Sequence, residues 1–127
     1  MIEPELYESV AEDNQTVSID MRPKGKKSAQ SPTELLLSAL SGCVAVDIVT
    51  MLQKRKKTVS RFTITVDGTR QEEHPRYFTK IHSHYTITSP DVQQDELYKV
   101  AALALEKYCS VGASLRSELT FSVEVQR

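Results

Sequence analysis

A helix-start signal stands directly before the most apolar segment of the chain, and this segment limits how the chain can fold. Ser31 is predicted to cap the helix, Pro32 suits its first position, and Glu34 can reach back to the cap. Apolar residues then cover most of the helix circumference as far as Val49, and the helix is predicted to end near Lys56. A helix with so little polar surface is expected to be buried.

Alternating apolar and polar residues predict a hairpin before this helix. Residues 6–10 and 16–21 are its two strands, and residues 13–15 between them are typical of a turn because Asp and Asn side chains bond local backbone. In the second strand Val17, Ile19 and Met21 share one face. We expect that face to be the half-buried one.

The same alternation predicts two strands after the helix. The first contains Phe62, Ile64 and Val66 and is expected to end at Gly68 or shortly after it. The second covers residues 77–87. The two are expected to form an antiparallel pair.

A second helix and a closing strand complete the pattern. The helix is predicted to start at Ser89-Pro90-Asp91, and residues 119–125 alternate as a strand. One face of this helix is predicted to be buried and contains Leu97, Val100, Ala101, Ala104, Leu105 and Tyr108. Grouped strands with two main helices predict an α+β fold with an antiparallel sheet, in a single domain over residues 1–127.

Composition limits the partners and the compartment. The 16 Lys and Arg against 17 Asp and Glu give a net charge of −1, which attracts neither nucleic acid nor an anionic membrane. No apolar run is expected to approach the ~20 residues of a membrane span, and the first ten residues lack the features of a signal peptide. We therefore predict a cytoplasmic protein without a membrane partner. Its two apolar helices leave more apolar surface than one small domain covers, which favours a homodimer.

Two cysteines are too few for a secreted disulfide framework. Each cysteine is therefore expected either to pack as an inert core residue or to take part in redox chemistry. Cys43 lies on the apolar helix after Gly42, and a glycine inside a helix usually needs a packing reason. Cys109 follows the second helix, where a new helical turn can begin. Backbone N–H groups there are expected to stabilise its thiolate and lower its pKa, and Cys109 is expected to be the more accessible of the two.

Together the cysteines suggest a peroxide-reducing dithiol, in which one thiolate becomes a sulfenic acid and the other condenses with it to a disulfide. This requires their Cα atoms to lie within about 7 Å. An attacking Cys43 also needs a nearby cation, for which Arg22 is the candidate, and Glu34 is a candidate to hold that arginine in place.

Other chemistry has weaker support. His82 and His84 share a strand face at a spacing compatible with a metal, but no third ligand is evident, so we predict no metal and no other cofactor. The basic run at residues 54–57 is expected to be a solvated helix end rather than a nucleic-acid contact.

Three segments of the chain resemble the OsmC/Ohr family, in its small OsmC-like branch. They are SPTELLLSALSGCVAVDIV, KIHSHYTI and LEKYCSVGASL, and the resemblance extends over residues 31–125. It implies an OsmC-like fold in which two chains intertwine as a homodimer, with active sites at the interface. By position Cys43 matches the peroxidatic cysteine and Cys109 the resolving one. Arg22 is a proposed substitute for the family's catalytic Arg, and Glu34 lies one residue after Thr33, which occupies the position of the family's Glu.

The resemblance implies a thiol-dependent peroxidase that reduces organic hydroperoxides or hydrogen peroxide, without a cofactor. An external dithiol reductant would regenerate the enzyme. The alternative is a non-catalytic dimer of the same fold that binds an apolar small molecule or senses oxidation.

Overall fold

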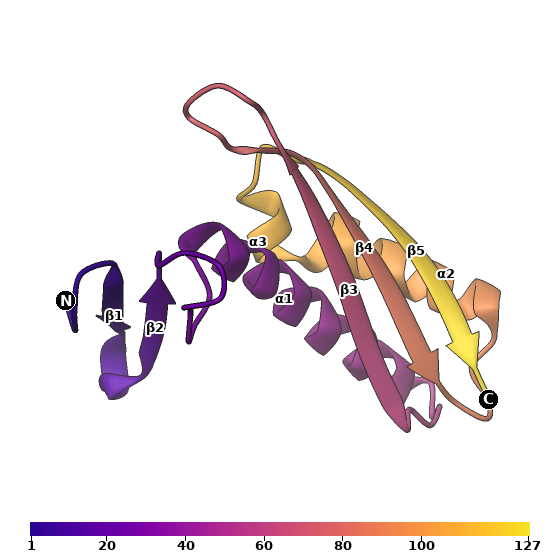
Figure 1. The fold of residues 1–127 in the computed structure, drawn as a ribbon. Coiled ribbons are helices and arrows are strands. Elements are labelled where there is room, and N and C mark those ends of the chain that lie inside the picture. Colours follow the sequence, from indigo (N-terminus) through magenta and orange to yellow (C-terminus); the bar gives the residue numbers. More distant parts are fainter. The chain divides into compact units, whose positions relative to one another are not determined.

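The computed structural model describes residues 1–127, which divide into two compact units, Met1–Ser38 and Ala39–Arg127 (Figure 1). In the first unit, strands β1 (Leu6–Val10) and β2 (Thr16–Asp20) form the predicted antiparallel hairpin. A short 3-10 turn joins them, in which Asp13 and Asn14 have φ values of 63° and 60°. Asp and Asn tolerate this left-handed conformation better than most residues, which explains the turn.

The apolar face of β2 is covered less than predicted. Asp20 is fully buried, whereas Val17 is 46% exposed and Met21 53% exposed. Alternation correctly predicted a strand, and Ile19 on the predicted face is half-buried, but the fully buried residue is Asp20 on the other face, where Thr16 and Ser18 are exposed. The apolar face of the hairpin, which also includes Tyr7, stays open.

Helix α1 (Pro32–Lys54) begins as predicted. The backbone N–H of Glu34 donates to the Ser31 hydroxyl at 3.4 Å, and the Ser31 N–H donates to the Glu34 carboxylate at 3.3 Å, which is the reciprocal pattern of a capping box. The helix ends two residues before the predicted Lys56, because Lys56 has a φ of 61° and Lys57 N–H bonds back to the Leu52 carbonyl.

The apolar surface of α1 is only partly covered. Its four buried residues, spaced four apart, are Leu40, Val44, Ile48 and Leu52. On the opposite side Val46 is 66% exposed, and nothing in the chain lies within 4 Å of where a Gly42 side chain would begin. The expectation that the helix is buried therefore holds for one side of it.

We expected no segment with the length and composition of a membrane span, and this expectation was wrong, because helix α1 has both. α1 has 23 residues and a mean hydropathy of 2.1 in its most apolar window, because its many Leu, Val, Ile and Ala residues outweigh the few polar residues, Asp47 included. Core helices also have this length and composition, and four residues of α1 are packed inside the chain.

The second unit contains a three-stranded sheet of β3 (Arg61–Arg70), β4 (Phe78–Thr88) and β5 (Glu118–Gln126), in that order. β3 and β4 are antiparallel as predicted, whereas β5 runs parallel to β4. The parallel pair follows from the helical connection between β4 and β5, which returns the chain to the starting edge. β3 continues past Gly68 to Arg70, because Thr69 and Arg70 still pair with β4. The Phe78 ring lies where a side chain at residue 68 would stand, so a glycine suits this position.

Helix α2 (Gln94–Leu103) continues as a π-helical turn (Ala104–Tyr108) and is followed by the short helix α3 (Ser110–Ala113). It starts later than predicted, because the Ser89 hydroxyl accepts N–H bonds from Asp91 and Val92 in a turn before the helix. The predicted buried face is confirmed except for Tyr108, which is exposed. α2 and the part of α1 in this unit lie on the same side of the sheet (Figure 1).

Candidate functional site

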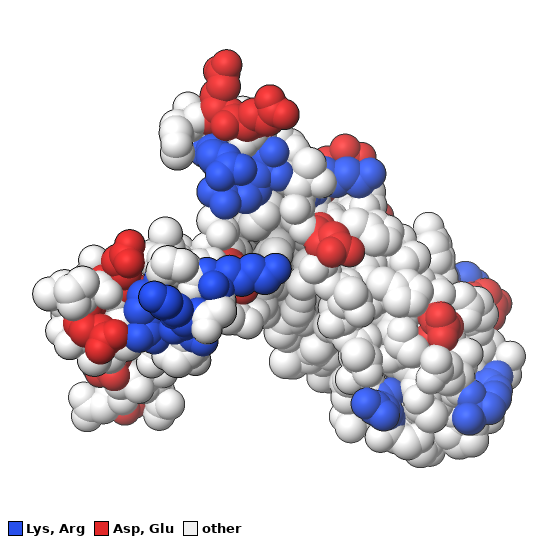
Figure 2. Space-filling model, viewed as in Figure 1, with Lys and Arg blue, Asp and Glu red and all other residues white.

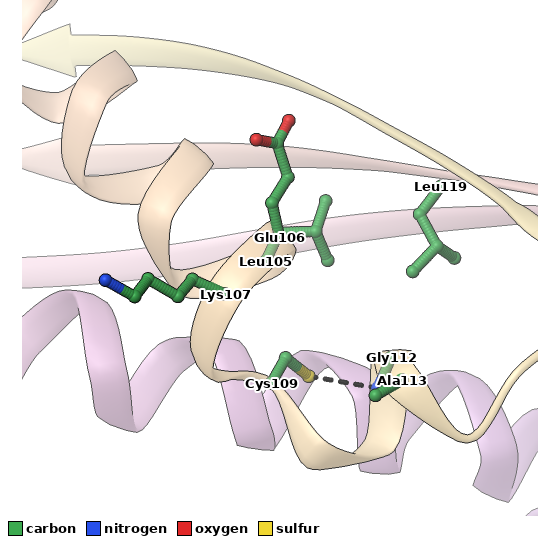
Figure 3. Close-up of a pocket in the computed structure, with 7 residues that line it drawn as sticks. All are labelled: Leu105, Glu106, Lys107, Cys109, Gly112, Ala113 and Leu119. Atoms are coloured by element: carbon green, nitrogen blue, oxygen red, sulfur yellow. Dashed lines mark hydrogen bonds between the residues drawn. The ribbon is translucent and has the colours of Figure 1, made fainter.

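Cys109 is positioned by the break between the π-helical turn and α3. Its backbone is extended, and its sulfur accepts a hydrogen bond from the Gly112 N–H at 3.2 Å, so Cys109 caps α3 (Figure 3). Gly112 keeps this approach open, because a side chain there would begin 3.4 Å from the sulfur and 3.2 Å from Leu119. The predicted contact between the thiol and a new helical turn is therefore present.

The two cysteines are neighbours in the second unit, although they are far apart in the sequence. The Cys43 side chain on α1 lies near enough to Cys109 to raise the pKa of the Cys109 thiol. Both are free thiols. Cys43 is half-buried, whereas Cys109 is only 4% exposed. The expectation that Cys109 is the more accessible cysteine was wrong.

The pKa of the Cys109 thiol is raised, opposite to the predicted direction. Burial is the main cause, and the hydrogen bond with Cys43 raises the pKa further. The N–H groups of Gly112 and Val111 lower it, but by less than burial raises it. The prediction considered the helix start and not the loss of water around the sulfur. Cys109 therefore rests as a neutral thiol.

A cavity of about 260 Å³ opens beside Cys109. Its walls are mostly apolar, and the side chains of Glu106 and Lys107 extend away from the sulfur (Figure 3). The lining residues are Leu105, Glu106, Lys107, Cys109, Gly112, Ala113 and Leu119. Only a small molecule or part of a larger one fits a space of this size.

The Arg22 side chain is held by groups of its own unit. It donates from Nε and Nη2 to the two carboxylate oxygens of Asp20, at 2.9 and 2.7 Å, and from Nη1 to Glu3 at 2.6 Å. Asp20 also accepts the Ser28 N–H at 2.8 Å. Two carboxylates therefore balance the charge of Arg22, and its role as the cation beside Cys43 stays a prediction.

Glu34 does not hold Arg22, in contrast to the suggested role. Its carboxylate pairs with the Lys27 ammonium and accepts the Ser31 hydroxyl at 2.8 Å. The capping position explains this, because it turns Glu34 toward the first turn of α1 and the loop before it. Asp20, which sequence reasoning missed, is the residue that clamps the arginine.

The first unit is expected to lose stability in acid from about pH 4 downward, with the Glu34 contribution lost by about pH 2 and the Asp20 contribution at lower pH. The Arg22 side chain holds the pKa of Asp20 well below its usual range, and the Lys27 and Ser31 side chains lower that of Glu34 to about 2. A carboxyl with a lowered pKa stabilises the folded state above its unfolded pKa of about 4, and this stabilisation is lost as the pH falls through the folded value.

An NMR titration from pH 6 to about pH 1 that follows the Ser28 and Ser31 amide signals tests this prediction. Both amides donate to these carboxylates, so their signals should move only below about pH 3, and Asp20→Asn should abolish the Ser28 transition. Midpoints near pH 4 at both amides would show that the carboxylates are not stabilised.

His82 and His84 lie on the face of β4 that points away from the helices. Thr120 contacts Nδ1 of His82 at 2.7 Å, and Ser122 contacts Nδ1 of His84 at 2.6 Å. No three His, Cys, Asp or Glu side chains of residues 1–127 converge as metal ligands. The histidines belong to a polar network between β4 and β5, and the prediction that no metal or other cofactor is used stays a prediction.

The basic run after α1 is engaged with α2 and the turn before it. Arg55 and Lys57 lie 3.4 and 3.6 Å from the Glu96 carboxylate, and Lys57 donates to the Asp91 carbonyl at 3.0 Å. On the face shown in Figure 2, acidic and basic side chains are interspersed and do not form one extended basic patch. Both observations favour the solvated helix end over a nucleic-acid contact.

Comparison with known proteins identifies the family. Residues 25–124 match the OsmC-like protein family. Protein YhfA of Escherichia coli (strain K12) is 38% identical over 99 residues, which are 76% of this chain and 74% of YhfA. The chain therefore belongs to the OsmC-like family, and the resemblance noted in its motifs is confirmed.

Solved structures confirm the fold. A hypothetical protein from Aquifex aeolicus VF5 superposes with a TM-score of 0.73 at 28% identity, over 96% of this chain and 95% of the other. An organic hydroperoxide resistance protein from Elizabethkingia anophelis superposes with a TM-score of 0.67 at 16% identity, over 98% and 91%. At such identity the second likeness shows the fold alone.

Proposed function

We propose that the protein is a thiol-dependent peroxidase that uses Cys43 and Cys109. The observation that carries the proposal is the proximity of two free thiols from distant parts of the chain, where Cys43 is near enough to raise the Cys109 pKa. The Cys43 thiolate attacks the O–O bond of a hydroperoxide, which leaves Cys43 as a sulfenic acid and releases the alcohol or water after protonation. Cys109 then displaces the sulfenic oxygen, which leaves as water, and a Cys43–Cys109 disulfide forms.

The environments of the two thiols support this division of roles. Cys43 is half-buried and so can meet a substrate. Cys109 is buried and remains protonated until it reacts with the Cys43 sulfenic acid. A thiol with a raised pKa is a poor first nucleophile at neutral pH but can react with a sulfenic acid held against it. The apolar cavity beside Cys109 favours an organic hydroperoxide.

The same proposal includes Arg22 as the cation that supports the Cys43 thiolate and an external dithiol that reduces the disulfide. The enzyme would work in the cytoplasm without a cofactor. Glu34 then contributes through the start of α1 and the Lys27 pair rather than through Arg22.

A homodimer is also part of the proposal. The open side of α1 and the apolar face of the hairpin expose Val46, Tyr7, Val17 and Met21 to solvent in the single chain. Gly42 supports it independently: nothing in the chain packs against this glycine, which costs the helix about 1 kcal/mol relative to alanine. A second copy of α1 lying close to Gly42 would supply the missing reason.

Intact mass spectrometry tests the dithiol chemistry directly. One equivalent of cumene hydroperoxide should convert the reduced protein to a form lighter by two hydrogens, with a single intramolecular disulfide between Cys43 and Cys109. Cys109→Ser should instead gain one oxygen, and Cys43→Ser should stay unchanged. Thiols that persist in the unsubstituted protein would remove the peroxidase proposal. A bridge that forms and cannot be recycled by any dithiol would favour an oxidation sensor.

A further inference from the structure

A second cavity, of about 270 Å³, lies beside the C-terminal half of α1. It shares no lining residue with the cavity beside Cys109. It is smaller than the pockets that take drug-sized ligands, so a ligand that fills it is a small molecule. Four of its lining residues are on α1 and the fifth ends the π-helical turn: Asp47, Thr50, Met51, Lys54 and Tyr108.

Two opposite charges in this cavity have no partner in the chain. Among residues 1–127, neither the Asp47 carboxylate nor the Lys54 ammonium makes an ion pair or a hydrogen bond. The neighbouring Arg55 and Lys57 differ in this respect, because both approach Glu96, at 3.4 and 3.6 Å. The cavity therefore offers one free anion and one free cation to a ligand.

Asp47 has no structural reason to stand on this helix. It is half-buried and is the only charged residue of α1 between Glu34 and Lys54. Aspartate is a weak helix former, and a carboxylate that loses part of its water without gaining a partner destabilises the fold. Its charge also opposes a thiolate at Cys43, one turn earlier. A ligand with a positive group beside Asp47 would remove both disadvantages.

The two charges are on the same stripe of α1 as Cys43. Asp47, Thr50 and Lys54 follow Cys43 by four, seven and eleven residues, a spacing that places side chains along one helix face. Long helical side chains lean toward the N-terminus, so Lys54 leans toward Thr50 and Asp47, in agreement with the cavity that they share. Along this face a sulfur is thus followed by a carboxylate and then by an ammonium.

An α-amino acid has the complementary arrangement of groups. Its ammonium and carboxylate are attached to one carbon atom, from which the side chain also extends. A ligand with a single charge would satisfy either Asp47 or Lys54 and be repelled by the other. An ammonium at Asp47 and a carboxylate at Lys54 direct the side chain of the amino acid along the stripe toward Cys43.

We propose that this cavity binds the charged head group of a free α-amino acid, and that the substrate of Cys43 is a hydroperoxide on the side chain of such an amino acid. The inference rests on the proposed function for the reaction itself. The Cys43 thiolate forms a bond to the terminal oxygen of the hydroperoxide as the O–O bond breaks. Cys43 becomes a sulfenic acid, and the amino acid leaves as its side-chain alcohol after its oxygen takes up a proton.

Binding is tested with L-leucine as the probe and without any peroxide. In an NMR titration of the reduced protein, leucine should move the amide signals of Asp47, Thr50 and Lys54. Asp47→Asn and Lys54→Gln should each weaken binding about fivefold, the size expected for a partly exposed ion pair. Lys99→Gln is the matched control, because Lys99 is an exposed lysine of α2 outside the cavity, and it should leave binding unchanged.

Ligands that lack one charge show which residue binds which group. Leucinamide has no carboxylate and should bind the parent protein about fivefold more weakly than leucine, whereas Lys54→Gln should bind the two equally. 4-Methylpentanoate has no ammonium and should behave in the same way with Asp47→Asn. If leucine moves none of these amide signals, or if both variants bind it as tightly as the parent protein, the inference is overturned.

Turnover separates this inference from the peroxidase proposal. A side-chain hydroperoxide of leucine is compared with cumene hydroperoxide, which has no charge, and the ratio of their kcat/KM values cancels any change in the Cys43 thiolate. The ratio should fall about fivefold in Lys54→Gln and stay the same in Lys99→Gln; an unchanged ratio in Lys54→Gln would overturn the substrate assignment. If leucine binds through both charges but neither hydroperoxide is consumed, the peroxidase proposal fails and the amino-acid site stands. If cumene hydroperoxide is consumed and leucine does not bind, the inference fails alone.

Discussion

Cys43→Ser is expected to lower the consumption of cumene hydroperoxide, with a dithiol as recycler, by at least about a thousandfold. Serine keeps nearly the same volume, but its hydroxyl is not ionised at neutral pH and does not attack the O–O bond at a useful rate. Because Cys109 rests as a buried, protonated thiol, it is not expected to substitute for Cys43. A coupled assay of peroxide loss, with circular dichroism to confirm folding, measures the effect.

Cys109→Ser is the informative partner variant. It should reduce one equivalent of hydroperoxide per chain at an undiminished rate and then stop or slow, with Cys43 trapped as a sulfenic acid that a dimedone probe labels. If instead Cys109→Ser abolishes the first turnover while Cys43→Ser retains it, the roles are reversed. If both variants consume peroxide as fast as the parent protein, the dithiol is not the reacting group.

Local signals in the sequence were sufficient where a few neighbouring residues determine the structure. The start of α1 depends on hydrogen bonds between Ser31 and Glu34, and these residues were enough to predict it. The turn at Asp13 and Asn14 depends likewise on residue types that accept positive φ. The order of strands and helices follows from the period of the apolar residues, which changes between about two and 3.6 along the chain.

The predictions that failed depend on which residues distant in the sequence pack against a given side chain. Alternation along β2 does not say which face the rest of the chain covers, so the burial of Asp20 and the exposure of Val17 could not be anticipated. The pKa of Cys109 depends on burial by residues distant in the sequence, and this effect exceeds the local one of the helix start. The proximity of Cys43 and Cys109 was permitted by helix periodicity but needed the tertiary structure to establish it.

Tyr85, in the core of the second unit, is a further case in which tertiary neighbours decide what the sequence does not show. In the sequence it is one of several apolar residues of β4, and its alternation predicted burial correctly. Its unused hydroxyl becomes visible only when every neighbouring donor and acceptor is in place.

Gly42→Leu is expected to raise the dissociation constant of the homodimer at least about 30-fold. In a single chain the new side chain enters open space, since nothing lies within 4 Å of its first atom. In a dimer that brings a second α1 close to Gly42, the leucine overpacks the contact at a cost of about 1–3 kcal/mol, and two-fold symmetry introduces it twice. Sedimentation velocity over a concentration series measures the shift.

The two oligomeric states predict opposite results for this substitution, which makes it decisive. Leucine is a far better helix former than glycine, so in a monomer Gly42→Leu would stabilise α1 by several tenths of a kcal/mol or more and raise the melting temperature. In a dimer it weakens association and lowers the melting temperature at a given protein concentration. Lys99→Leu, on an exposed position of α2, adds similar apolar surface away from α1 and should change neither. A more stable Gly42→Leu protein with unchanged sedimentation would mean that no second chain approaches this side of α1, and would leave the glycine without a packing reason.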